Sequence, residues 1–107
     1  MIRFITPYQM KLEKKYVNKA LKSNWLAPLG PYVDKFEKEL QDFTGVIECI
    51  AVNSGTSAIH LALKQIKLKK GDVVFCSDMT FIASVNPVLY EGGIPVFIDT
   101  NVNDWTM

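Results

Sequence analysis

Two amphipathic helical patterns open the chain. In residues 11–25, "KLEKKYVNKALKSNW", apolar residues recur every three or four positions with lysines between them, which predicts a helix. "SNWLAPLGP" interrupts that pattern with two prolines and a glycine. A second helix is predicted after it, with Gly45 as its stop. The predicted apolar stripes are Leu12, Tyr16, Ala20 and Leu21 in the first helix, and Val33, Phe36, Leu40 and Phe43 in the second.

From residue 46 the pattern changes to strands alternating with helices. "VIECIAVN" (46–53), "VVFCS" (73–77) and "IPVFIDT" (94–100) are short, apolar and rich in β-branched residues, which is typical of strands covered on both faces. "TSAIHLALKQIKL" and "TFIASVNPVLYEGG" between them are predicted helices, the second bent or limited in its first turn by Pro87. The stripe of the first is Ile59, Ala62, Leu63 and Ile66. This order predicts an α/β fold with a mainly parallel sheet.

Composition excludes several classes of protein. The 107 residues carry a net charge of +1, and the lysines form no patch, so we expect neither a nucleic-acid nor a membrane partner. No stretch reaches the roughly 18 apolar residues of a membrane span, and the start lacks a secretory h-region, so a cytoplasmic protein is expected. Cys49 and Cys76 are isolated; we expect two reduced core thiols and no metal site.

The stretch "NSGTSA", which begins at Asn53, follows the first predicted strand and opens the next helix. In a parallel sheet, ligands bind beyond the carboxyl ends of the strands. The first N–H groups of a helix have no intrahelical partner and favour an anion. Gly55 permits close backbone approach, and Thr56 and Ser57 add hydroxyl donors. The local chemistry predicts a phosphate cradle; the alternative is that Ser54 or Thr56 is simply an N-cap and Gly55 a turn residue.

Neighbouring residues refine this hypothesis. The nucleotide P-loop and the Gly-x-Gly-x-x-Gly fingerprint are both absent from the sequence. Phe81 lies just past the second predicted strand, where it either stacks on a flat ring whose phosphate rests on the cradle or fills the core. His60 shares the polar helix face with Lys64 and Lys67, so we expect it to be solvated. Asp72 and Asp99 are expected to be structural.

Four segments together resemble the N-terminal portion of the DegT/DnrJ/EryC1/StrS family of pyridoxal-phosphate (PLP) sugar aminotransferases. They are "SNWLAPLGPYVDKFEKEL", "AVNSGTSAIHLAL", "GDVVFCSDMTFIASVNPVLYEGGIPVFIDT" and "DWTM". The resemblance implies the PLP-dependent transferase fold type I, with an aspartate aminotransferase-like large domain truncated after about three strands. Residues 1–45 would be a helical segment with a substrate loop, and residues 46–107 the start of the PLP-binding domain.

The resemblance also implies roles for individual residues. Gly55, Thr56 and Ser57 would bind the PLP phosphate, and Phe81 would stack on the pyridine ring. The loop Asn24, Trp25, Leu26 and Ala27 would contact the sugar nucleotide. "SNWLAPLGP" and "TFIASVNPVLYE" are most similar to enzymes that aminate a UDP-linked 4-keto-6-deoxy-HexNAc for surface polysaccharide or glycan synthesis. The implied amino donor is glutamate, and the implied assembly of the full-length enzyme is a homodimer.

The catalytic machinery of the family is expected to lie downstream of residue 107. No lysine here sits in the family's Schiff-base motif, so we expect no catalytic residue in this segment and no transamination by it alone. Apolar faces and an unpaired sheet edge are expected to leave it poorly soluble or partly folded. Two other interpretations stay open: a non-catalytic binding module, and the inactive remnant of a truncated gene.

Overall fold

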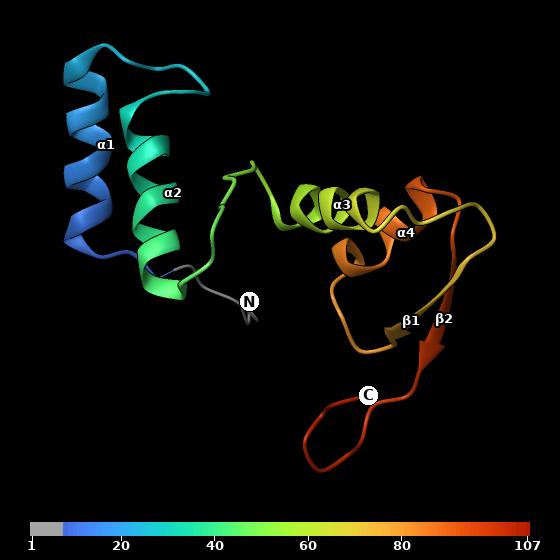
Figure 1. Ribbon diagram of the computed structural model, residues 1–107. Helices are drawn as coiled ribbons and strands as arrows, with labels where there is room; N and C mark the ends of the chain where they lie inside the picture. The colour runs from blue at the N-terminus through green and yellow to red at the C-terminus, as the bar shows by residue number, and fades with distance from the viewer. Residues whose placement is uncertain (1–7) are drawn as a thin grey trace. The chain divides into compact units, whose positions relative to one another are not determined.

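The computed structural model describes residues 8–107, which form two compact units, one up to residue 51 and one from residue 52 onward. The first contains α1 (Lys11–Ser23) and α2 (Pro31–Thr44). The second contains α3 (Gly55–Gln65), β1 (Val73–Ser77), the 3-10 turn η1 (Ile82–Ser84), α4 (Asn86–Tyr90) and β2 (Ile94–Ile98) (Figure 1). The functional division at residues 45 and 46 stays a prediction.

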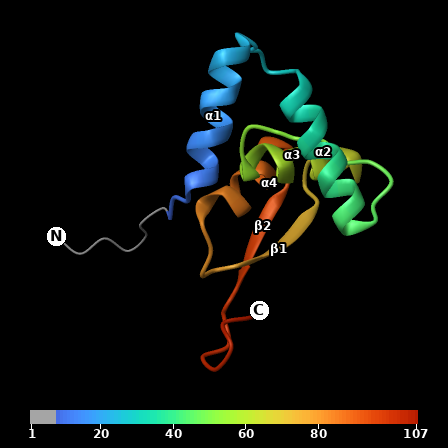
Figure 2. The same ribbon diagram turned by 90° about the vertical axis from the view of Figure 1, so that its left-hand side faces the viewer.

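In the first unit, both predicted helices are confirmed, and the loop at residues 24–30 joins them (Figures 1 and 2). α1 ends at Asn24, whose φ of 57° is left-handed and whose N–H donates to the carbonyl of Leu21. α2 begins with Pro31 in its first turn and ends at Gly45, whose φ is 76°. Gly45 is therefore the predicted stop, because glycine adopts this conformation without steric cost.

The strand predicted over residues 46–53 does not form. Among the described residues, β1 and β2 pair with each other and no strand pairs with this segment. The N–H of Ala51 donates instead to Oε1 of Glu37, at 2.7 Å. Apolar and β-branched composition favours a strand, but a strand also needs a neighbouring backbone to satisfy its N–H and C=O groups. The prediction was wrong because composition does not reveal whether that neighbour is present.

The second unit is built on a two-stranded parallel sheet, so the α/β class is confirmed with two strands in place of three. Val73 pairs with Ile94, and the register continues to Ser77 opposite Ile98. The helix predicted over residues 80–93 is divided into η1 and α4, and Pro87 falls in the first turn of α4. Proline limits the start of this helix, as expected, because it lacks the N–H that an interior position requires.

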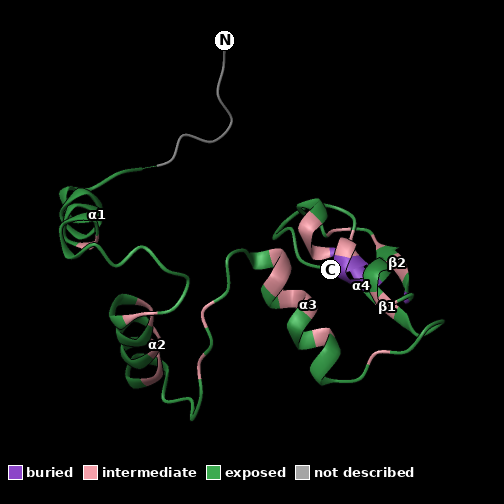
Figure 3. Ribbon diagram, turned by 90° about the horizontal axis from the view of Figure 1, so that it is seen from above, coloured by how far each residue is buried: buried purple, intermediate pink, exposed green. Residues whose placement is uncertain are grey.

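The core of the second unit lies between one sheet face and the helices. Cys76, Val85 and Val88 are buried, and Leu63, Leu68 and Val74 pack partly buried around them. Figure 3 shows this buried patch around α4 and the neighbouring sheet. Cys76 is thus the core thiol that we expected, whereas Cys49 is half-buried and lies outside any strand.

The opposite face of the sheet, called the bare sheet face below, is largely uncovered, although Val96 and Ile98 on it are half-buried. Because side chains alternate along a strand and paired residues share a face, Val73, Phe75 and Ile94 lie together on the side away from the core, and each is more than half exposed. The expectation of strands covered on both faces was therefore wrong for the described chain. α3 and α4 supply a cover for one face alone.

None of the helices described between residues 8 and 107 combines the length and the apolar character that crossing a bilayer requires.

Candidate anion-binding site

The start of α3 is capped by a side chain. Ser54 has an extended backbone, and its Oγ accepts a hydrogen bond from the N–H of Ser57 at 3.1 Å. Its carbonyl accepts the N–H of Ala58, also at 3.1 Å. Ser54 is therefore the N-cap that satisfies one of the orphan donors of the helix. Of the two candidates for the cap, the structure selects Ser54 and not Thr56.

A short chain of hydroxyl and amide groups holds the turn in shape. Ser57 Oγ donates to Oδ1 of Asn53 at 2.7 Å and lies 2.9 Å from Oγ of Ser54. Both donors of Ser57 are thus engaged within the turn. An anion that uses the Ser57 hydroxyl has to replace the bond to Asn53.

Two backbone N–H groups at the start of α3 have no hydrogen-bond partner within residues 8–107. Among the described residues, the N–H groups of Gly55 and Thr56 meet no acceptor. No acidic side chain lies in the first turn, and a Cβ added at Gly55 would meet no atom within 4 Å. The positive end of the α3 dipole therefore carries two free N–H groups, an arrangement that favours an anion such as a phosphate.

Phe81 lies at the start of η1, shortly after β1 ends. Its side chain is 79% exposed, so the alternative that it fills the core was wrong. Its carbonyl accepts the N–H of Ser84 at 2.9 Å, which fixes the backbone there. η1 contacts α3, so the elements that carry Phe81 and the helix start pack together. Stacking of the Phe81 ring on a cofactor stays a prediction.

His60 corrects one expectation. It does not lie on a solvated face: its Nε2 is 2.5 Å from Oε1 of Glu91, and its ring meets the ring of Tyr90 edge-on at 5.4 Å. Lys64 Nζ is 3.0 Å from the same Glu91 oxygen. The hydrogen bond from Lys64, followed by that from His60, lowers the pKa of Glu91 below its ordinary value. The helical pattern missed this cluster because Glu91 lies 31 residues beyond His60.

The two aspartates have the structural roles that we expected. Asp72 Oδ2 accepts the N–H of Lys69 at 2.8 Å and closes the turn before β1. Asp99 Oδ1 accepts the N–H of Thr100, also at 2.8 Å, directly after β2. In the described part of the chain, no group of three or more potential ligands is placed to hold a metal ion.

The predicted substrate loop belongs to the first unit, where Trp25 organises it. The Trp25 indole Nε1 donates to the carbonyl of Leu29 at 2.6 Å. Gly30 has a φ of 149°, and the Trp25 ring occupies the space that a side chain at Gly30 would need. Asn24 is left-handed, while Leu26 and Ala27 are exposed. The structure explains the shape of this loop, and its contact with a sugar nucleotide stays a prediction.

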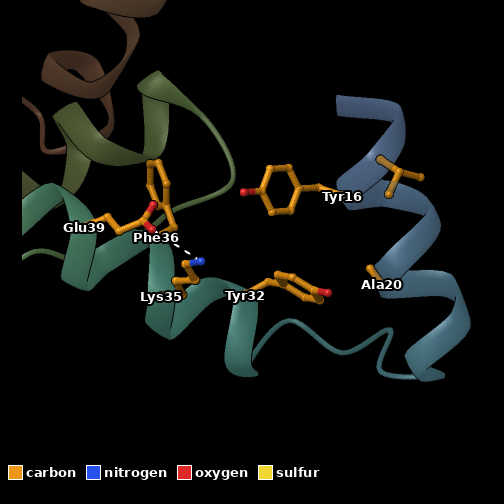
Figure 4. Close-up of a pocket in the computed structure, with 7 residues that line it drawn as sticks. Tyr16, Ala20, Tyr32, Lys35, Phe36 and Glu39 are labelled. Carbon is orange, nitrogen blue, oxygen red and sulfur yellow. Dashed lines mark ion pairs between the residues drawn. The ribbon is translucent and has the colours of Figure 1, made fainter. Parts of the chain in front are cut away.

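An open groove between α1 and α2, with a volume of about 410 Å³, was not predicted (Figure 4). Tyr16 and Tyr32 face each other across it, with ring centres 6.4 Å apart. Lys35 and Glu39 form an exposed ion pair at 3.5 Å on its edge. The apolar stripes of the two helices predict buried faces, but α1 and α2 leave the apolar faces that line this groove partly exposed.

Comparisons with known proteins show the family. The model of the DegT/DnrJ/EryC1/StrS aminotransferase family matches residues 7–107, and the chain belongs to that family. It is 50% identical over 101 residues to the Bacillus subtilis protein EpsN, named as a pyridoxal phosphate-dependent aminotransferase, covering 94% of the chain and 26% of EpsN. It is 38% identical over 109 residues to GDP-perosamine synthase of Escherichia coli O157:H7, covering 99% of the chain and 30% of that enzyme.

A solved structure agrees in fold. The chain superposes on the PLP form of Spr1654 from Streptococcus pneumoniae, described as a sugar aminotransferase, with a TM-score of 0.82 and 29% identity. The superposition covers 97% of the chain and 26% of Spr1654. The described residues therefore have the fold of the matching part of a PLP-dependent sugar aminotransferase. The chain spans between a quarter and a third of the length of these relatives.

Proposed function

We propose that the chain is the cofactor-phosphate-binding part of a PLP-dependent aminotransferase that acts on a nucleotide-linked keto-sugar. The observation that carries the proposal is the free pair of N–H groups at Gly55 and Thr56, at the positive end of α3. These donors would hold the phosphate, and Gly55 would let it approach the backbone. Phe81, exposed beside α3, would pack against the pyridine ring.

PLP, when bound, supplies an electron sink that lets an amino group pass between donor and acceptor. Gly55, Thr56, Ser57 and Phe81 would bind and orient it. The family resemblance favours a UDP-linked 4-keto-6-deoxy-HexNAc as acceptor, glutamate as donor and a homodimer for the full-length protein, in surface polysaccharide synthesis. One relative is named for a GDP-linked sugar and another for a dTDP-linked sugar, so the nucleotide differs among relatives and keto-sugar recognition is the broader proposal. Asn24, Trp25, Leu26 and Ala27 would contribute to it.

The cradle can be tested with pyridoxamine 5′-phosphate, which lacks the aldehyde that would react with surface lysines. Titration into the ¹⁵N-labelled chain should shift the amide resonances of Gly55, Thr56 and Ser57. A triple replacement of Thr56, Ser57 and Phe81 by alanine should weaken binding at least about tenfold, since it removes hydroxyl contacts and the stacking ring. Equal affinity in the triple variant would refute the assigned site.

We also propose that the 107-residue chain does not transaminate by itself. The family resemblance implies that none of the chain's lysines sits in the family's Schiff-base motif. Incubation with PLP, glutamate and a UDP-4-keto sugar should yield no amino sugar by mass spectrometry. Product formation would contradict this proposal and favour a catalytic group within the chain.

A further inference from the structure

A polar cluster joins α3 to the end of α4. One carboxylate oxygen of Glu91 meets both His60 Nε2, at 2.5 Å, and Lys64 Nζ, at 3.0 Å. The Glu91 side chain is 17% exposed and that of His60 is 31% exposed, so the pair is shielded more than an ordinary surface ion pair. The ring of Tyr90 packs edge-on against His60 and covers one side of the cluster.

α3 packs against α4 and η1, but none of its residues is fully buried. The buried core residues Cys76, Val85 and Val88 all lie outside α3, which contributes a partly buried Leu63. Among the described residues, the polar side-chain contacts between α3 and the end of α4 are those of His60 and Lys64 with Glu91. Because no residue of α3 is fully buried, we expect these polar contacts to contribute to fixing the angle of the helix.

The direction of α3 matters because its start carries the cradle. The helix is a stiff rod of 11 residues, so a tilt at His60 and Lys64 moves the N–H groups of Gly55 and Thr56. Phe81 precedes η1 and α4 on the other side of the contact. A change in the cluster would therefore move the helix start relative to the ring of Phe81.

We propose that Glu91 is a positioning residue for cofactor binding: through His60 and Lys64 it holds α3 at the angle that places the Gly55 and Thr56 N–H groups for the phosphate. This inference rests on the proposed function. In this role Glu91 acts through His60 and Lys64 and not through a contact of its own with the cofactor. A residue that only stabilises the fold would leave the ligand affinity of folded chains unchanged. A positioning residue changes that affinity even when the chain remains folded.

The variant Glu91→Gln separates the positioning role from a simple charge effect, because the two predict opposite changes in binding affinity. Glu91→Gln removes a negative charge and so favours binding of an anion. If Glu91 positions α3, the same variant weakens binding of pyridoxamine 5′-phosphate by about threefold to tenfold, the range expected for coupling through packed elements. The amide shifts of Gly55 and Thr56 should also move in the ligand-free protein.

Lys64→Met supplies a second measurement in case Glu91→Gln does not fold, because the Lys64 side chain is 59% exposed. Its control is Lys67→Met, which removes the same charge near the end of α3 from an exposed lysine. Asp42→Asn is the control for Glu91→Gln, since it breaks the exposed Lys38–Asp42 pair in the other unit. Lys64→Met should weaken binding more than Lys67→Met, and Asp42→Asn should leave it unchanged.

The outcomes separate this inference from the proposed function. Shifts at the cradle amides of the unaltered chain, together with weaker binding by folded Glu91→Gln, support both. Such shifts with equal or tighter binding by Glu91→Gln overturn the positioning role and leave the proposed function standing. Absence of cradle shifts in the unaltered chain overturns the proposed function, and the positioning role with it.

Discussion

Gly30 combines a backbone conformation and a contact that other residues do not tolerate. Its φ of 149° and ψ of 178° lie in a region that is almost confined to glycine. A Cβ added there would overlap Nε1 and Cδ1 of the Trp25 indole. The glycine therefore makes room for the ring that shapes the loop before α2.

Gly30→Ala should displace the Trp25 ring and break its hydrogen bond to Leu29. The expected loss is about 1–3 kcal/mol of local stability, from backbone strain and the displaced ring. The NMR resonance of the Trp25 indole N–H should move toward the position of an exposed indole. Gly45→Ala is the matched control, because its φ of 76° is also left-handed but no atom lies within 4 Å of the added Cβ. An unchanged indole resonance in Gly30→Ala would contradict the assignment.

At the scale of the helix, capping and anion binding at α3 make opposite demands on Ser54. Aspartate is as good an N-cap as serine and interacts well with the helix dipole. Its charge would, however, lie beside the free N–H groups of Gly55 and Thr56 and repel a phosphate. Ser54→Asp should therefore keep or raise the melting temperature while weakening pyridoxamine 5′-phosphate binding at least about fivefold.

The neutral variant Ser54→Asn provides the comparison for this prediction, since asparagine caps equally well without a charge. It should retain both stability and most of the affinity. Ser54→Ala should lose about 1 kcal/mol of stability through the missing cap. Equal phosphate affinity in Ser54→Asp and Ser54→Asn would place the anion away from this helix start.

Glu91 gives the second unit a dependence on pH. Its pKa in the folded chain is lowered from 4.5, first by Lys64 and then by His60. A lowered pKa means that the carboxylate stabilises the fold above pH 4.5, and that this contribution is lost as the pH falls through the folded-state value. Thermal unfolding between pH 3 and 6 should therefore show a decrease in melting temperature on acidification, and Glu91→Gln should flatten it.

Asp104 titrates in the same acidic range and needs its own control. The backbone N–H of Thr106, at 3.1 Å, and then the Thr106 hydroxyl, at 2.9 Å, lower its pKa. Asp104→Asn should remove a separate part of the pH dependence. If the slope persists in full in Glu91→Gln and disappears in Asp104→Asn, the cluster at α3 does not control acid stability.

Most elements could be predicted from the sequence because their signals are local. The 3.6-residue periodicity of α1 and α2, Gly45 as a stop and Pro87 at the start of α4 each depend on residues a few positions apart. The failures involve partners distant in sequence. Residues 46–53 have strand composition without a neighbouring strand, and His60 was assigned to the polar face because Glu91 is not visible in a helical pattern.

The candidate site divides in the same way. The cradle at Gly55 and Thr56 follows from one turn of sequence, so its geometry was predictable. Phe81 was predicted beside it because each was expected to follow a strand of one parallel sheet. The strand before the cradle does not form, but the structure still places Phe81 exposed, directly before η1, which contacts α3. The role of Asn24 to Ala27 came from family resemblance alone, since no local chemistry in that loop indicates a sugar nucleotide.

At the scale of the whole chain, many large apolar side chains are exposed to solvent. Phe75 is 64% exposed on the bare sheet face, next to Val73 and Ile94. Phe43, in α2, is 88% exposed. Contiguous exposed apolar surface favours association, and an open strand edge adds a template for pairing with another chain.

We therefore expect the isolated 107-residue chain to self-associate through the bare sheet face. Phe75→Thr replaces the most exposed ring on that face with a smaller residue that still favours a strand, so it should shift the oligomer distribution toward monomer in light scattering without changing the circular dichroism spectrum. Phe43→Thr removes an even more exposed ring from α2 and should have a smaller effect. Equal effects of the two variants would mean that exposed apolar area in general, and not the sheet face, drives association. If neither variant changes the distribution, strand-edge pairing becomes the better explanation, because it depends on backbone groups that both substitutions leave in place.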